Sequence, residues 1–274
     1  MKNPIYENHL KEVMKERPVF GVTIYSGCPQ FIELLGYAGF DFAFIDAEHC
    51  PWEPTALKDA VLAARTVGVS PLVRVTKPDM IEIRKALEMG AEGVIIPHVR
   101  TIEEMETCVK GAKFPPLGRR GFDMNIRAAQ YGYNMGGVEF YEEANRTELV
   151  IPMAEDFEFT DQLDEMLAVP GVDAINFGPA DFSMSLNCKT NTTGGNSFYD
   201  LNDSPADVAM KDIIAKARPK GIGVMAPAVP PTYENAKCLI DKGVNMVIMG
   251  NDFGNYGSAL RNIHDETLAK FIKK

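Results

Sequence analysis

The chain has 274 residues, of which 46% are hydrophobic and 24% are charged. This balance is typical of a soluble globular protein and excludes a disordered or fibrous chain. The formal net charge is −10, and no basic run is longer than a pair such as Arg119–Arg120. An acidic chain of this kind is not expected to bind nucleic acid or an anionic membrane.

Five scattered cysteines without a CxxC pair indicate neither a disulfide framework nor a thiolate zinc site. The N-terminal segment lacks the apolar core of a signal peptide, and no apolar run approaches the roughly 20 residues that span a bilayer. With reduced cysteines, these features predict a cytoplasmic protein. No linker is evident, so a single domain over residues 1–274 is predicted.

Short apolar runs alternate with amphipathic stretches along almost the whole chain. The predicted strands, in chain order, are Val19–Tyr25, Phe40–Asp46, Pro71–Val75, Gly93–Pro97, Leu149–Met153, Val172–Phe177, Gly221–Met225 and Val244–Met249. The predicted helices are Pro29–Tyr37, Glu53–Thr66, Asp79–Met89, Thr101–Gly111, Glu158–Leu167, Ala206–Arg218, Pro231–Lys242 and Gly257–Lys273. Asp79 is a predicted N-cap, and Thr101 opens a capping-box pattern.

Two stretches interrupt this alternation. Phe114–Arg146 is rich in Gly, Arg and Tyr with little periodicity, and the polar stretch Asn187–Pro205 is predicted to be a long loop. Elsewhere the strands are continuous apolar runs, as expected for a parallel sheet buried on both faces. About eight strand–helix units in roughly 250 residues favour a closed (β/α)8 TIM barrel, with an open doubly wound sheet as the alternative.

Polar side chains follow the ends of several predicted strands, where the active sites of such barrels lie. They are Asp46, Glu48, His49, Arg74, His98, Arg100, Glu155, Asp156 and Asp181. Glu155 and Asp181, on separate strands, can bind a hard divalent cation that a 2-keto acid would also contact. Arg74 can donate to a carboxylate or an oxyanion, and His49 can transfer protons near neutral pH. For His98 and Arg100 we expect local structural bonds.

Five segments in this order resemble the class II pyruvate aldolases, which include 4-hydroxy-2-oxoheptanedioate and 2-dehydro-3-deoxyglucarate aldolases. The segments are GFDFAFIDAEH (39–49), PLVRV (71–75), ALEMGAEGVIIPHV (86–99), FPPLGRRG (114–121) and NFGPADFS (176–183). The resemblance runs from about Gly21 to Phe253. It implies a barrel of the phosphoenolpyruvate/pyruvate-binding type that needs a divalent ion (Mg²⁺, Mn²⁺ or Co²⁺) and no organic cofactor. It also implies a homo-oligomer, a hexamer or trimer of dimers, whose last helix packs on a neighbouring subunit.

The resemblance also implies catalytic roles. His49 matches the proton-transfer histidine, and Arg74 matches the arginine that binds the keto acid and stabilises the enolate. Glu88 matches an acidic residue, usually aspartate, that supports the basicity of the histidine. Asp46 and Glu48 are expected to orient the histidine or the groups around the metal.

The same resemblance assigns the metal and substrate contacts. Glu155 and Asp181 match the two metal ligands, although a shift of one residue in the match would put Asp156 in place of Glu155. Gly178 and Ala180 lie in the loop whose backbone approaches the substrate carboxylate, with Asp181 beside them.

The sequence departs from the family pattern in four places. Met153 stands where the family often has glutamine, and Thr23 stands where a bulky aromatic residue is often found. The insertion at 187–205 is longer than usual, and the stretch 122–133 is idiosyncratic. All four are expected to line the substrate or acceptor pocket, so the enolate chemistry is predicted to be intact while the specificity differs.

The leading functional prediction is reversible cleavage of a 4-hydroxy-2-oxo acid to pyruvate and an aldehyde through a metal-stabilised enolate. The alternative is an oxaloacetate decarboxylase, or a macrophomate-synthase-like enzyme that forms carbon–carbon bonds at the same site. A lyase for acyl-coenzyme A esters is a further variant, against which the lack of a basic patch counts. A non-catalytic, keto-acid-binding barrel also remains open. No lysine stands convincingly at a strand end, which argues against a Schiff-base aldolase.

Overall fold

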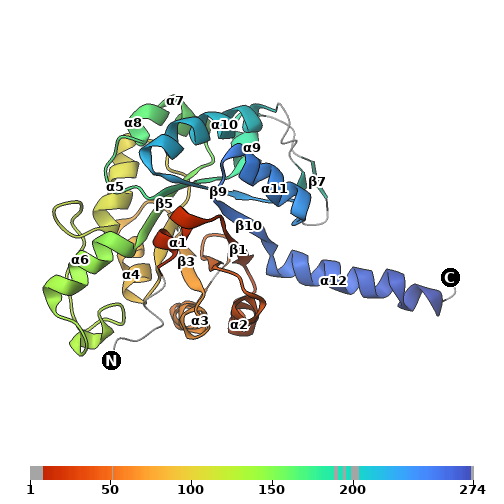
Figure 1. Cartoon of the computed structure of the whole chain (residues 1–274), viewed down its shortest axis with the longest axis horizontal. Helices are drawn as coiled ribbons and strands as arrows, with labels where there is room; N and C mark the ends of the chain where they lie inside the picture. The colour runs from red at the N-terminus through yellow and green to blue at the C-terminus, as the bar shows by residue number, and fades with distance from the viewer. Residues whose placement is uncertain (1–8, 51, 188–190, 194–195, 199–203, 273–274) are drawn as a thin grey trace.

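The computed structural model describes residues 9–50, 52–187, 191–193, 196–198 and 204–272. Within these residues eight parallel strands close into a barrel in the order β1-β10-β9-β6-β5-β4-β3-β2 (Figure 1). The strands are β1 (Val19–Ile24), β2 (Phe42–Asp46), β3 (Ser70–Arg74), β4 (Gly93–Ile96), β5 (Leu149–Ala154), β6 (Ala174–Phe177), β9 (Gly223–Pro227) and β10 (Met246–Asn251). The barrel confirms the predicted fold class, and the open-sheet alternative is wrong.

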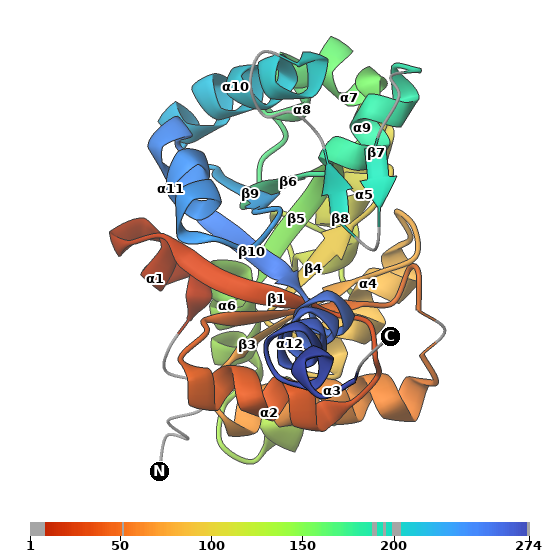
Figure 2. The ribbon, with the colours of Figure 1, turned by 90° about the vertical axis from the view of Figure 1, so that its right-hand side faces the viewer.

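Helices follow the strands and surround the barrel (Figure 2). They are α1 (Leu10–Glu16), α2 (Pro29–Ala38), α3 (Pro54–Thr66), α4 (Met80–Glu88), α5 (Ile102–Ala112), α6 (Gly137–Thr147), α7 (Phe157–Asp161), α8 (Leu163–Met166), α9 (Pro179–Ser185), α10 (Pro205–Ala217), α11 (Tyr233–Lys242) and α12 (Asp252–Glu266). Asp79 caps α4 through the N–H groups of Ile81 and Glu82, and Thr101 and Glu104 form the predicted capping box of α5. The helix predicted over Glu158–Leu167 is instead two short helices, because Gln162 leaves the helical conformation (φ −118°, ψ 24°).

Alternate residues of each strand point to opposite sides of the barrel wall. Phe44, Leu72 and Ile151 belong to the cluster inside the barrel, whereas Ile45 and Val73 belong to the cluster between strands and helices. On each strand, the side chain two residues after the last inner residue points the same way. It therefore faces the mouth of the barrel. The hydrophobic pattern of the strands therefore positions the polar side chains at their ends.

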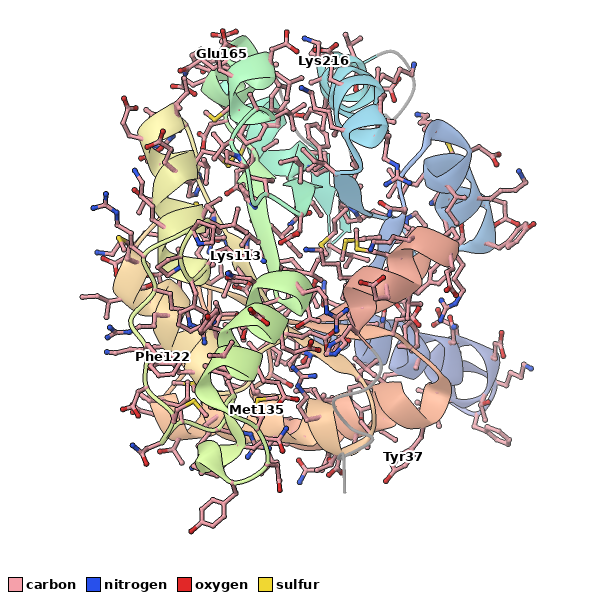
Figure 3. The ribbon with its side chains drawn as sticks, turned by 60° about the vertical axis from the view of Figure 1, so that its left-hand side comes forward. Tyr37, Lys113, Phe122, Met135, Glu165 and Lys216 are labelled. Carbon is pink, nitrogen blue, oxygen red and sulfur yellow. The ribbon has the colours of Figure 1, made fainter. Side chains whose placement is uncertain are left out.

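The stretch Phe114–Arg146, for which no element was predicted, contains most of α6 and a small hydrophobic core. Phe114, Ala129, Phe140 and Ala144 form this core, and Figure 3 labels Phe122 and Met135 in the same segment. The low periodicity of the sequence did not indicate α6, whereas residues 114–129 and 133–136 are irregular, with neither helix nor strand. The contacts of this core join residues far apart in sequence, so they leave little local periodicity.

The polar stretch predicted as a loop over Asn187–Pro205 contains a two-stranded antiparallel pair, β7 (Asn191–Thr193) and β8 (Asn196–Phe198). The expectation of a structureless loop is wrong for these two strands. The segments 188–190, 194–195 and 199–203 of this stretch lie outside the described residues.

The last helix begins at Asp252, five residues before the predicted start at Gly257, because the Asn251 side chain caps it by accepting from the N–H of Gly254 at 2.7 Å. α12 extends away from the barrel (Figure 1), and its residues from Phe253 onward are partly or fully exposed. In the described part of the chain no helix is both long enough and apolar enough to cross a membrane.

Candidate active site

A cavity of about 230 Å³ opens at the end of the barrel where the strands terminate. Its lining includes Thr23, Tyr25, Phe44, Arg74, Met153, Glu155, Asn176, Gly178, Ala180 and Asp181, together with segment 227–231 and the start of α12. This is the end at which (β/α)8 barrels carry their active sites. Most of the residues predicted from the sequence to contact substrate or metal therefore share one cavity.

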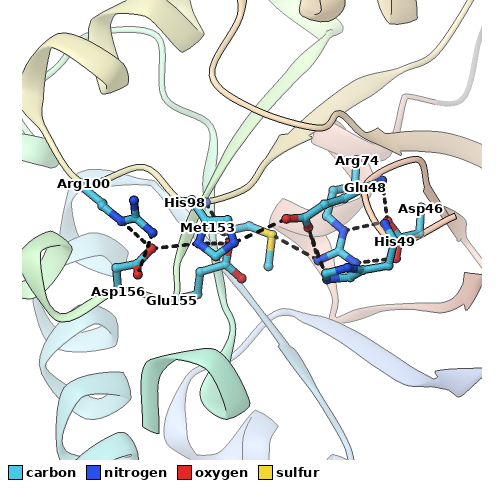
Figure 4. A network of polar contacts seen from close by, with 9 residues as sticks. All are labelled: Asp46, Glu48, His49, Arg74, His98, Arg100, Met153, Glu155 and Asp156. Carbon is cyan, nitrogen blue, oxygen red and sulfur yellow. Dashed lines mark hydrogen bonds and ion pairs between the residues drawn. The ribbon is translucent and has the colours of Figure 1, made fainter. Parts of the chain in front are cut away.

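Two acidic side chains hold the guanidinium of Arg74 at the end of β3 (Figure 4). Its Nε donates to Asp46 Oδ1 at 2.9 Å, its Nη2 donates to Asp46 Oδ2, and its Nη1 lies 2.8 Å from Glu48 Oε2. Asp46 is fully buried and also accepts the backbone N–H groups of Glu48 and His49. Burial lowers the pKa of Arg74, but the bonds to Asp46 outweigh it and raise that pKa above its ordinary value. Arg74 is therefore a fixed cation.

His98 connects Glu48, which follows β2, with the two acids that follow β5 (Figure 4). Its Nδ1 lies 2.9 Å from Asp156 Oδ2, its Nε2 lies 3.4 Å from Glu48 Oε1, and its backbone N–H donates to Glu155 Oε1 at 2.7 Å. Its φ of 51° is rare for a residue other than glycine. Burial lowers the pKa of His98, but the bond to Asp156 and the nearby acidic charges raise it overall. The expected local bonds of His98 and Arg100 are present, since Arg100 Nε also lies 3.1 Å from Asp156.

Glu155 is the buried acid of the cavity, with 1% of its surface exposed. Its ion-pair contact within the described residues is with His98 Nδ1, at 3.6 Å. Burial raises the pKa of Glu155 to about 7, against the bond from the His98 backbone, and the charge of Asp181 acts in the same direction as burial. A Cβ at position 178 would lie 2.9 Å from Glu155 Oε2, so glycine there leaves this oxygen room.

The carboxylates of Glu155 and Asp181 supply the oxygen ligands that a hard divalent ion takes, and such an ion keeps water or substrate in its other positions. Across the described ranges, no group of three or more His, Cys, Asp or Glu could hold a metal ion. An ion bound by these two carboxylates would take its remaining ligands from water or substrate. Asp156, the alternative ligand, is bonded to His98 and Arg100 and is not part of the cavity lining.

Two predicted catalytic residues lie outside the cavity lining. The His49 side chain is 61% exposed beside the site, with Nε2 3.6 Å from Glu48 Oε2. Glu88 ends α4, lies 3.7 Å from Arg84 Nε, and lines another cavity with Ile126 and Tyr131. Within one chain, the structure does not bring Glu88 to His49, and the roles of both residues stay predictions.

Tyr25 and Asn176 line the cavity, although the sequence analysis gave neither a role. Each stands two residues after an inward position of its strand, Thr23 and Ala174 respectively, so the period of two was the available signal. Burial raises the pKa of Tyr25 to about 12, which keeps its hydroxyl protonated near neutral pH.

Comparison with known proteins identifies the family. The sequence model of the HpcH/HpaI aldolase/citrate lyase family matches residues 21–259. The chain belongs to this family. A curated relative, 5-keto-4-deoxy-D-glucarate aldolase from Salmonella paratyphi C, is 28% identical over 97% of this chain and 98% of its own length. The predicted assignment to a carbon–carbon lyase of the aldolase type is thereby confirmed.

Several solved structures share the fold. A Burkholderia cenocepacia HpcH/HpaI family protein is 25% identical, with a TM-score of 0.83 over 95% of this chain and 99% of that one. The citrate synthase SbnG is 28% identical, with a TM-score of 0.82 over 96% and 98%. A citrate lyase β subunit from M. tuberculosis, solved with oxaloacetate and magnesium, has the same fold at 13% identity and a TM-score of 0.56, covering 91% and 97%.

Proposed function

We propose that this HpcH/HpaI family member is a divalent-metal-dependent aldolase that reversibly cleaves a 4-hydroxy-2-oxo acid to pyruvate and an aldehyde. The observation that carries the proposal is the pair of carboxylates Glu155 and Asp181, which shares a cavity with the fixed cation Arg74. A hard cation and a guanidinium on one cavity suit a ligand that carries a carboxylate and a keto oxygen. The aldolase activity named for the Salmonella relative supports the same reaction class.

Glu155 and Asp181 would hold the ion, with Mg²⁺, Mn²⁺ and Co²⁺ as the candidates. Among the described cationic side chains, only His98 approaches the buried Glu155 carboxylate. The glycine at position 178 leaves room beside Glu155 Oε2. A divalent cation bound there would draw electron density from the 2-oxo group of the substrate. No organic cofactor enters the proposal.

Arg74 supplies the second positive charge. Its Nη1 contacts Met153 Sδ at 3.9 Å as well as Glu48, and a thioether is a weak acceptor. A substrate oxygen can therefore replace this contact and receive a stronger hydrogen bond. Asp46 and Glu48 hold the guanidinium in place, so little reorganisation is needed when negative charge develops on that oxygen.

Cleavage breaks the C3–C4 bond of the substrate. A base removes the proton of the 4-hydroxyl, the aldehyde departs, and the electron pair is left on the pyruvate enolate, whose oxygen Arg74 stabilises. His49 then transfers a proton to C3 and completes the methyl group of pyruvate. The backbone of Gly178 and Ala180 lies on the cavity wall, where it can orient the substrate carboxylate.

The test is pyruvate release from a panel of 4-hydroxy-2-oxo acids by chelator-treated protein, with Mg²⁺, Mn²⁺ or Co²⁺ added back. We expect activity to be lost on chelation and restored by at least one ion. Glu155→Gln should abolish the restoration, whereas the neighbouring Asp156→Asn, outside the cavity lining, should keep it.

Full activity after chelation, or a covalent lysine adduct trapped by borohydride with pyruvate, would contradict the proposal. Unchanged turnover in His49→Ala would remove the histidine from the mechanism. Oxaloacetate belongs in the same panel. Carbon dioxide release from oxaloacetate, without cleavage of any hydroxy-keto acid, would favour the decarboxylase or bond-forming alternative.

We also propose that the single-domain chain acts in the cytoplasm as a homo-oligomer, a hexamer or a trimer of dimers. The projecting α12 supports association, because apolar residues on one side of it are exposed, among them Phe253, Tyr256, Leu260 and Ile263. These positions are three or four residues apart and form a stripe along the helix. A neighbouring subunit would cover that stripe.

A further inference from the structure

The floor of the cavity is largely apolar. The inward residues of the strands beneath it include Phe44, Met153 and Ile248, which belong to the hydrophobic cluster inside the barrel. Asn176 stands among them on β6. Its register neighbours are Met153 on β5 and Met225 on β9, so the flanking strands place apolar side chains beside its amide.

The amide of Asn176 is buried and incompletely paired. Only 2% of the residue is exposed, and Oδ1 has no hydrogen-bond partner in the described part of the chain. Two other amides of the cavity lining are used by the fold: Asn251 caps α12 by accepting from Gly254 at 2.7 Å, and Asn255 donates to the carbonyl of Met249 at 3.0 Å. Both of these side chains contribute a hydrogen bond to the fold, whereas Asn176 Oδ1 contributes none within the described residues.

A buried polar atom without a partner destabilises the folded protein, and a leucine of similar size would avoid that cost. Such a group on the wall of a ligand cavity is explained if a ligand completes its hydrogen bonding. A hydroxyl is the matching group, because it can donate to Oδ1 and can equally accept from the amide nitrogen after the side chain rotates by 180°.

The position of Asn176 indicates which part of the ligand it meets. The cavity joins a charged half, with Arg74, Glu155 and Asp181, to a half walled by segment 227–231 and the start of α12. In barrel order β6, which itself leads to Asp181, lies between β5, which leads to Glu155, and β9, which leads to segment 227–231, so Asn176 stands where the two halves meet. A keto acid in the charged half would thus extend its remaining carbons over Asn176.

We infer that Asn176 is a specificity-determining residue that binds a hydroxyl group on the aldehyde-derived half of the substrate. The inference rests on the proposed aldolase function. The enzyme should therefore prefer hydroxylated aldehydes over their deoxy counterparts. With a deoxy aldehyde, the Asn176 amide would stay unpaired.

The experiment is condensation of pyruvate with matched aldehydes that differ by one hydroxyl, glycolaldehyde with acetaldehyde and glyceraldehyde with propanal. Wild-type protein, Asn176→Leu and Asn176→Thr are compared under metal-loaded conditions. In at least one pair we expect Asn176→Leu to lower kcat/KM for the hydroxylated aldehyde about 10-fold or more, the value of one hydrogen bond. The deoxy partner should change by less than about 3-fold. Asn176→Thr, which keeps a hydroxyl, should retain part of the preference.

Two further readouts separate this role from a structural one. Exchange of the methyl protons of pyruvate with D₂O needs no aldehyde, so Asn176→Leu should change its rate by less than about 3-fold, the same limit as for the deoxy aldehyde. The melting temperature of Asn176→Leu should rise, because the variant removes an unpaired buried amide. A lower melting temperature with equal losses on both aldehydes of each pair, or no change on either, would overturn the inference. Absence of proton exchange in the wild-type protein would instead overturn the proposed function and the inference with it.

Discussion

The neighbours of Arg74 fix the position of its guanidinium. Two of its N–H groups donate to Asp46, its Nη1 forms an ion pair with Glu48, and the contact with Met153 Sδ marks a place for a substrate oxygen. A lysine at this position would keep the charge but would lose the planar fork of donors.

Arg74→Lys is therefore expected to lower kcat/KM for pyruvate release about 100- to 1000-fold, the usual effect of losing one oxyanion donor. The matched control is Arg17→Lys, which alters another two-point bond of arginine to aspartate, with Asp41, outside the cavity lining. Steady-state kinetics of the two metal-loaded variants checks the prediction. Equal effects of the two substitutions would contradict a specific role for Arg74.

The Glu155 carboxyl leads to a prediction about pH. Its pKa in the metal-free protein is about 7 because of burial, against an ordinary 4.5, so the protonated form is favoured up to about pH 7. Metal binding requires the carboxylate and must release this proton at lower pH. Affinity for Mg²⁺ should consequently rise by up to about 10-fold per pH unit below 7 and level off above it.

Titration calorimetry at pH 6, 7 and 8, in buffers with different ionisation enthalpies, measures both the affinity and the proton release. Glu155→Gln, which has no such proton, should lose the binding. An affinity that does not vary between pH 6 and 8 would show that Glu155 is not the titrating ligand.

Among the elements, the connection from α5 through α6 to β5 depends on a buried ion pair. Arg120 donates to Glu148, and its guanidinium lies 4.7 Å from the ring centroid of Phe114 and 5.9 Å from that of Phe140. The buried Lys113, labelled in Figure 3, donates to the backbone carbonyls of Asn145 and Glu148. These contacts attach the 114–148 segment to the barrel.

Arg120→Met should lower the free energy of unfolding by about 3–5 kcal/mol, because it leaves the Glu148 carboxylate buried without its partner. The double variant Arg120→Met/Glu148→Leu should recover much of this loss. Denaturant unfolding provides the measurement, and Arg119→Met, at the exposed neighbouring position, should change stability by less than about 0.5 kcal/mol. A double variant no more stable than the single one would refute the unpaired-charge explanation.

At the scale of the whole molecule, α12 projects from the barrel and leaves apolar side chains exposed. Leu260→Glu is expected to weaken or abolish assembly, because it places a charge in the apolar stripe that we assign to a subunit interface. Asn262→Glu adds the same charge on the opposite face and should leave the assembly intact. Light scattering coupled to size-exclusion chromatography gives the masses, and a wild-type monomer would contradict the proposed oligomer.

The fold was largely predictable, because each barrel strand is a continuous apolar run and each major helix has a periodic face or a capping residue. Asp79 and Thr101, for example, cap α4 and α5 as predicted from local sequence. The start of α12 was placed too late, since its cap, Asn251, is also the last residue of β10. The core around Phe114 and Phe140 was missed, because its contacts depend on tertiary packing rather than on local periodicity.

For the candidate site, the sequence by itself determined which polar residues follow the strands, and parallel strands must bring those residues to one end of a barrel. Only the tertiary structure decided which of them share a cavity. It placed Glu155 rather than Asp156 in the lining, separated Glu88 from His49 within the chain, and set Asn176 between Met153 and Met225. The physical reason is that burial, pairing and register depend on side chains distant in sequence, whereas strand and helix patterns are local.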